Sequence, residues 1–123
     1  MKRIINSNSI TVLDDNDNEL LCITEQLSNG VMDFRVSGKL STEVSCDFED
    51  ELTACAGVCM RINLDLGAVT YISSVALRAL LSVQQLMDEY EEAMMCITAI
   101  NKSVLDVFKE NGFDQIFIID SLY

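Results

Sequence analysis

From residue 20 onward, apolar residues recur in two alternating patterns, and this alternation limits the folds that the chain can adopt. Apolar residues at every second position, or in short continuous runs, are typical of strands, whereas spacings of three and four are typical of helices. The predicted strands are residues 20–26, 31–37, 60–66, 94–100 and 116–119, and the predicted helices are residues 41–56, 73–89 and 102–110.

This order of elements predicts a single α/β domain. Alternating strands and helices pair mostly in parallel, with the helices packed on the sheet. The first two strands flank the turn signal Ser28-Asn29-Gly30 and are expected to form a hairpin. The run 94–100 is almost continuously apolar, as in a strand buried on both faces. We expect a mixed, mostly parallel sheet of about four to five strands.

Residues 1–19 are expected to be an extension that precedes the domain at residues 20–123. Within the extension, only residues 10–13 are predicted to form a strand, at the edge of the sheet. The acidic segment that begins at Asp14 partly imitates a calcium loop, but Glu19 stands where such a loop requires glycine. We therefore predict a solvated turn there.

The net charge of the chain limits the kinds of partner that it can bind. Its 123 residues include 20 acidic and 8 basic side chains, for a net charge of −12. A surface of this sign repels nucleic acid and anionic lipid. The sequence contains no apolar run long enough to span a bilayer and no signal-peptide pattern. We expect a cytoplasmic protein that binds no nucleic acid and does not insert into membranes.

The chain offers little material for catalysis. It contains no histidine, so neither a Ser-His-Asp nor a Cys-His arrangement can form. Cys55 and Cys59 lack the further soft ligands that zinc needs. We predict no metal site, no cofactor and no enzyme activity; the catalytic alternative is a thiol enzyme that uses Cys59 or Cys22 as its nucleophile.

Three segments resemble the signature of the STAS family. Residues 64–81 read Leu-Asp-Leu-Gly-Ala-Val-Thr-Tyr-Ile-Ser-Ser-Val-Ala-Leu-Arg-Ala-Leu-Leu and are similar to the family's strand, serine-containing turn and helix start. Residues 36–40 resemble the strand that ends in Gly-Arg-Leu, and residues 107–113 resemble the Val-Phe and Gly-Phe pairs. The order and intervals are similar to those of anti-sigma factor antagonists.

This resemblance implies a partner-switching cycle. Such an antagonist binds an anti-sigma factor kinase, is switched off when the kinase phosphorylates it, and is restored by a phosphatase. The family's phosphoserine falls on Ser74, with Ser73 as the less favoured position. The chain is then a substrate rather than a catalyst, and a monomer or weak homodimer. The implied partner-binding residues are Ser41, Thr42, Tyr71, Ser73, Ser74, Val75 and Arg78.

The chemistry of the turn fits this role, although helix capping alone would also explain both serines. Backbone N–H groups and the positive end of the helix dipole favour a phosphate at a helix start. Arg78 lies four residues after Ser74 on the same helix face, where it either pairs with the phosphate or remains a solvated arginine.

Departures from the family pattern leave a second function open. Ser73 stands where aspartate is common, Ala76 replaces the usual glycine, and Ser41 replaces an aspartate that many relatives carry. The alternative is a STAS adaptor subunit of a transport or other signalling complex that is not phosphorylated. Asp65 imitates the acceptor of a phosphorelay receiver, but the acidic pair that holds magnesium in a receiver is missing after Leu40.

Overall fold

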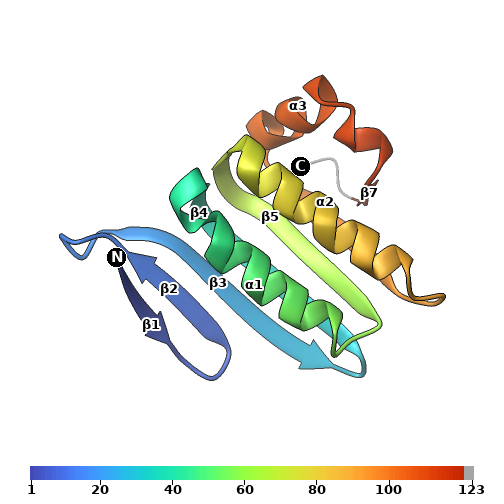
Figure 1. Ribbon diagram of the computed structural model, residues 1–123, viewed down its shortest axis with the longest axis horizontal. Coiled ribbons are helices and arrows are strands. Elements are labelled where there is room, and N and C mark those ends of the chain that lie inside the picture. The colour runs from blue at the N-terminus through green and yellow to red at the C-terminus, as the bar shows by residue number, and fades with distance from the viewer. Residues whose placement is uncertain (121–123) are drawn as a thin grey trace.

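The structure, a computed structural model, describes residues 1–120 as one sheet with helices packed on it (Figure 1). Two short 3-10 helices, η1 and η2, connect some of the longer elements. In chain order, the elements are β1 (Lys2–Ile5), β2 (Ser9–Leu13), β3 (Glu19–Ser28), β4 (Val31–Leu40), η1 (Thr42–Val44), α1 (Ser45–Ala56), β5 (Arg61–Ile72), α2 (Ser74–Asp88), β6 (Met94–Ile100), α3 (Lys102–Glu110), η2 (Phe113–Gln115) and β7 (Ile118–Ile119).

The sheet has seven strands, which lie side by side in the order of the sequence. β1 to β4 pair antiparallel, as the expected hairpin requires, and β4 to β7 pair parallel. This mixed sheet confirms the predicted α/β class. Its strand number exceeds the expected four to five because β1 and β2 extend the sheet beyond β3.

β1 was not predicted, for a physical reason. All four of its residues are exposed, so burial imposes no alternation of apolar and polar residues on them. Ion pairs help to fix this edge: the Lys2 ammonium lies 2.6 Å from Asp17, and Arg3 forms an ion pair with Asp47 of α1. β1 and β2 therefore form part of the same sheet as the later strands.

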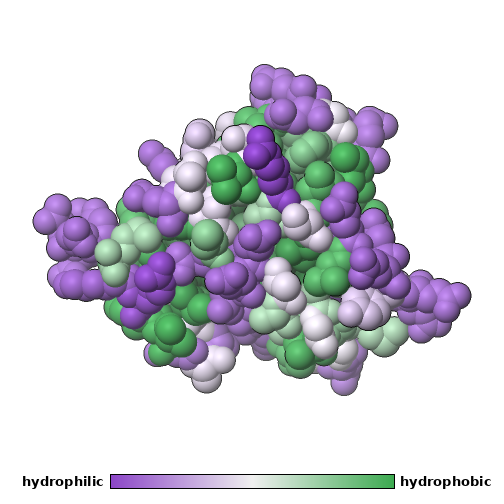
Figure 2. All heavy atoms as spheres, in the orientation of Figure 1, coloured by the Kyte–Doolittle hydropathy of each residue, from purple (hydrophilic) through white to green (hydrophobic). Residues whose placement is uncertain are grey.

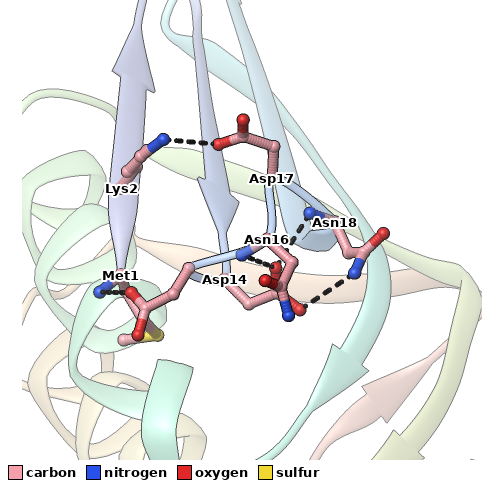
Figure 3. A network of polar contacts seen from close by, with 7 residues as sticks. Met1, Lys2, Asp14, Asn16, Asp17 and Asn18 are labelled. Carbon is pink, nitrogen blue, oxygen red and sulfur yellow. Dashed lines mark hydrogen bonds and ion pairs between the residues drawn. The ribbon is translucent and has the colours of Figure 1, made fainter.

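The acidic segment between β2 and β3 forms a turn around one carboxylate (Figure 3). Asp14 Oδ1 accepts hydrogen bonds from the backbone N–H groups of Asn16, at 2.8 Å, and Asn18, at 2.9 Å. Asp17 adopts a positive φ of 63°. The turn lies on the surface, as predicted, and its carboxylate oxygens are used by the chain's own N–H groups.

β5 continues well past residue 66, where the predicted strand ended. The parallel registers with β4 and β6 shift along this strand, which marks a β-bulge or similar irregularity. The shift changes which residues face the core, so Leu66, Val69 and Ile72 are all buried although they are three apart. The alternation of apolar and polar residues breaks at Gly67, and the strand predicted from that alternation therefore ended too early.

Helices α1 and α2 lie side by side on one face of the sheet (Figure 1). Their buried stripes meet the sheet in one core, where the rings of Phe34 and Phe48 pack edge to face with centroids 6.2 Å apart. Part of the sheet carries polar side chains around a shallow hollow of about 360 Å³, including Asp33, Arg35, Asn63, Asp65 and Thr98. Within residues 1–120, no helix combines the length and the apolar character needed to cross a membrane.

Candidate partner-binding site

The candidate site lies where β4 and β5 end together. Their parallel register pairs Leu40 with Ile72, the last residue of each strand. The next peptide continues this contact, because the Ser73 amide donates a 2.8 Å hydrogen bond to the Leu40 carbonyl oxygen. The segment that begins at Ser41 therefore lies beside the Ser73-Ser74 turn, although the two are separated by more than thirty positions in the sequence.

The two adjacent serines have different environments. Ser73 is the N-cap of α2 and is only 5% exposed; its Oγ accepts a 3.2 Å hydrogen bond from the Ala76 amide. Its carbonyl oxygen accepts a further bond from the Leu77 amide at 3.0 Å. Ser74 is the first residue of the helix and is exposed to solvent. The Ser73 hydroxyl therefore caps the helix, whereas Ser74 is an exposed residue beside it.

Hydrogen bonds from the start of α1 hold the segment that follows β4. The Ser45 hydroxyl donates a 2.8 Å hydrogen bond to the Ser41 carbonyl oxygen, and the Val44 amide donates to the same oxygen at 3.3 Å. Val44 and Ser45 are buried, whereas Ser41 is half-buried and Thr42 is exposed. This anchoring presents Ser41 and Thr42 at the surface in one defined backbone conformation.

The remaining predicted residues occupy different parts of the same end. Val75 and Arg78 are exposed on the first turns of α2. Tyr71 is also exposed, whereas the next residue, Ile72, is buried. Because neighbouring strand residues point to opposite sides, Tyr71 points away from the core and pairs in register with Lys39.

This end of the acidic molecule carries unpaired cations. Lys39, Arg78 and Lys102 are exposed, and no ion pair holds them within residues 1–120. The first turns of α2 and α3 contain no acidic residue. α3 begins close to the end of β5, where the Ser103 hydroxyl donates to the Thr70 carbonyl oxygen at 3.5 Å. Sequence analysis missed Lys39 and Lys102 because only the sheet topology brings their segments to one edge.

The thiols of Cys55 and Cys59 are not activated. Burial, followed by the hydrogen bond to Glu25, raises the pKa of the Cys55 thiol far above its ordinary range. Burial also raises the pKa of Cys59. A raised pKa leaves less thiolate at neutral pH, which argues against Cys59 as a catalytic thiol. Across residues 1–120, no group of three or more potential ligands is arranged to hold a metal ion.

Comparison with known families agrees with this architecture. The sequence model of the STAS domain matches residues 23–123. The chain belongs to the STAS domain family. At the level of whole sequences, no curated protein matches it.

Solved structures share this STAS fold at low sequence identity. An anti-sigma factor antagonist from Mycobacterium paratuberculosis is 19% identical, with a TM-score of 0.74 over 90% of this chain and 92% of that chain. The anti-sigma factor antagonist SpoIIAA in its unphosphorylated form is 10% identical, with a TM-score of 0.67 over 81% of this chain and 89% of that chain. SpoIIAA in its phosphorylated form, described as a Bacillus cell fate determinant, is 10% identical, with a TM-score of 0.63 over 81% and 92%. These similarities confirm the predicted fold.

Proposed function

We propose that this STAS protein is a cytoplasmic anti-sigma factor antagonist whose binding is switched off by phosphorylation of Ser74. The observation that carries the proposal is the exposed first residue of α2 beside the anchored Ser41-Thr42 segment. In the proposed cycle, the unphosphorylated surface binds an anti-sigma factor kinase, which then transfers phosphate from ATP to the Ser74 hydroxyl. A phosphatase restores the binding form. The chain acts as a monomer or weak homodimer.

Local electrostatics support Ser74 as the acceptor. In the first turn of α2, the Ala76 amide is used by the Ser73 cap, whereas the Ser74 and Val75 amides precede the first intrahelical hydrogen bonds. These N–H groups and the helix dipole favour an anion, and no carboxylate in that turn opposes it. Arg78, one turn further along the helix, is available for a charge-assisted hydrogen bond.

The negative charge of a phosphate on Ser74 explains why binding to the kinase would be lost. A phosphate adds about −1.5 to −2 charges at pH 7. At a docked interface, an unpaired buried charge costs roughly 2–5 kcal/mol. Since about 1.4 kcal/mol corresponds to a factor of ten, the affinity for the kinase falls by about 30-fold or more. SpoIIAA, which shares the fold, has been solved in both phosphorylated and unphosphorylated forms.

The test is phosphoryl transfer to the intact protein. The protein is incubated with ATP and each anti-sigma factor kinase encoded in the same genome, and its mass is measured before and after. We expect one added phosphoryl group, mapped to Ser74 by peptide sequencing. Ser74→Ala should abolish the addition, whereas Ser73→Ala should retain it.

A binding measurement then separates the switch from the alternative. By calorimetry, Ser74→Asp should weaken kinase binding about 30-fold relative to Ser74→Ala. If no encoded kinase adds phosphate and Ser74→Asp binds its partners as the unmodified protein does, the switch is wrong. The non-phosphorylated adaptor subunit of a transport or signalling complex is then the better assignment.

A further inference from the structure

A second surface lies at the other end of α2. Helix α2 runs from Ser74 to Asp88, and its 15 residues span about 22 Å at 1.5 Å per residue. Beyond its C-terminus, the α2–β6 turn and the α1–β5 turn enclose a pocket of about 300 Å³. Apolar and small residues dominate its lining, which consists of Ala56, Gly57, Cys59, Met60, Tyr90, Glu92 and Ala93.

Large apolar side chains stand exposed around this pocket. Met60 and Tyr90 are each 54% exposed, and Val58, in the same turn as Met60, is 64% exposed. Clustered apolar exposure of this kind marks interaction sites on soluble proteins, whereas single exposed apolar residues are ordinary. The surface around the pocket therefore resembles a binding site for a partner more than an ordinary solvent-exposed end of a domain.

Backbone hydrogen bonds fix the two turns that form the pocket. The Met94 amide donates to the Met60 carbonyl oxygen at 2.9 Å, which joins one turn to the other. The Met60 amide donates a hydrogen bond to the Gly30 carbonyl oxygen at 3.0 Å, and the Ala93 amide donates one to the Tyr90 carbonyl oxygen at 3.2 Å. A partner that binds here would meet a preformed pocket and would lose little free energy in ordering it.

The charged residues at the end of α2 and in the turn after it are all acidic. Four carboxylates occupy the end of α2 and the turn after it, and the last turn of α2 contains no basic residue. Carboxylates at a helix C-terminus face the negative end of its dipole, which is unfavourable without a cation nearby. Figure 2 shows this right-hand tip of the molecule as strongly hydrophilic. The four carboxylates are those of Asp88, Glu89, Glu91 and Glu92.

We propose that this pocket binds a basic amphipathic segment of a partner protein. One apolar side chain of the segment enters the pocket between Met60 and Tyr90, while its lysine or arginine side chains face Glu89, Glu91 and Glu92. A second copy of the chain is disfavoured as occupant because both copies carry a net charge of −12. The surface is separate from Ser74 and lets the protein hold one partner while the other end binds and releases its own.

A synthetic amphipathic peptide of leucine and lysine serves as the probe. It is titrated into isotope-labelled protein and followed by amide NMR shifts, with a scrambled peptide of the same composition as the control. We expect the shifts to cluster at residues 57–60 and 89–94, and the scrambled peptide to bind about tenfold more weakly. Shifts that spread over all acidic regions, or that centre on Ser74, would overturn the proposal.

Matched variants separate a site from general charge attraction. Glu91→Gln/Glu92→Gln and Tyr90→Ser should each weaken peptide binding about tenfold. The control pair Glu43→Gln/Asp106→Asn removes the same charge from exposed positions outside the pocket, and its affinity should change by less than about twofold. Equal losses in both double variants would contradict the site. Ser74→Asp should leave peptide binding unchanged, so this proposal and the phosphorylation switch fail independently.

Discussion

The Ser73 amide donates a 2.8 Å hydrogen bond to the carbonyl oxygen of Leu40, which joins the start of α2 to the end of β4. This bond continues the β4–β5 ladder by one residue beyond the last strand pair. It holds two segments of the candidate site in a fixed relation, so the site depends on the sheet as well as on its own loops.

Ser73→Ala should destabilise the protein by about 1–2 kcal/mol, because it removes the N-cap and leaves the buried Ala76 amide without its acceptor. Urea unfolding followed by circular dichroism measures the change. The matched control is Ser74→Ala, which removes an exposed hydroxyl and should cost less than about 0.5 kcal/mol. Equal costs for the two variants would show that the cap is not formed.

Gly38→Ala should cost about 3 kcal/mol or more. Gly38 has φ +113°, and an added Cβ would lie 2.5 Å from the Leu20 carbonyl oxygen of the neighbouring strand. Gly30→Ala is the control: its φ is +80°, but nothing lies within 4 Å of the added atom, so only backbone strain of about 1–2 kcal/mol remains. Chemical denaturation of both variants should rank them in this order, and the reverse order would refute the close contact.

Asp14→Asn should lower stability at pH 7 by weakening the turn between β2 and β3. Hydrogen bonds from Asn18, and then from Asn16, lower the pKa of the Asp14 carboxyl below its ordinary value. A carboxylate with a lowered folded pKa stabilises the protein above the unfolded pKa of about 3.9, and this stabilisation is lost as the pH falls through the folded value.

Urea unfolding of the wild type and Asp14→Asn at a series of pH values tests this sign. The stability difference should be largest near neutrality and shrink below about pH 4. Asp50→Asn on the exposed side of α1 controls for the loss of one negative charge. A difference that grows as the solution becomes more acidic would contradict the lowered pKa.

Thiol alkylation should distinguish exposed from buried cysteines. With iodoacetamide at pH 8, the exposed Cys46 should react first. The buried Cys55 thiol should react slowly, because burial raises its pKa and blocks access. The half-buried Cys59 thiol should also react slowly, because burial raises its pKa. Mass spectrometry of partly alkylated protein gives the order, and protein in urea, where all five thiols are accessible, is the control. Fast reaction of Cys59 in the folded protein would revive the thiol-enzyme alternative.

The elements that could be predicted from the sequence are those whose pattern is set by burial. Residues 94–100 and 102–110 were expected as a strand and a helix and are found with these bounds, because the strand is mostly buried and Asn101 caps the helix. β1 has no buried residue, and the irregular register along β5 breaks its alternation at Gly67. Neither feature leaves a period-two signal in the sequence.

The candidate site was predictable only in part. The resemblance placed Ser41 and Ser74 in one surface, and the β4–β5 register supplies the physical reason for their proximity. The resemblance favoured Ser74 over Ser73 as the phosphorylated residue, but the sequence did not indicate which of the two caps α2, because serine is a good cap at either position. The structure assigns the cap to Ser73. The pocket beside Tyr90 was missed because it joins two turns that are distant in the sequence.

The capping role of Ser73 has a consequence for selectivity. An enzyme that approaches this turn from solvent meets Ser74, which is exposed. Ser73 is buried, and its hydroxyl accepts the hydrogen bond from the Ala76 amide. Under the proposed switch, the fold of the protein itself selects between the two adjacent serines, and the kinase needs no further discrimination. A short unstructured peptide with the same Ser-Ser sequence would lack that choice, and it would be a poor stand-in for the native protein in any assay of site preference.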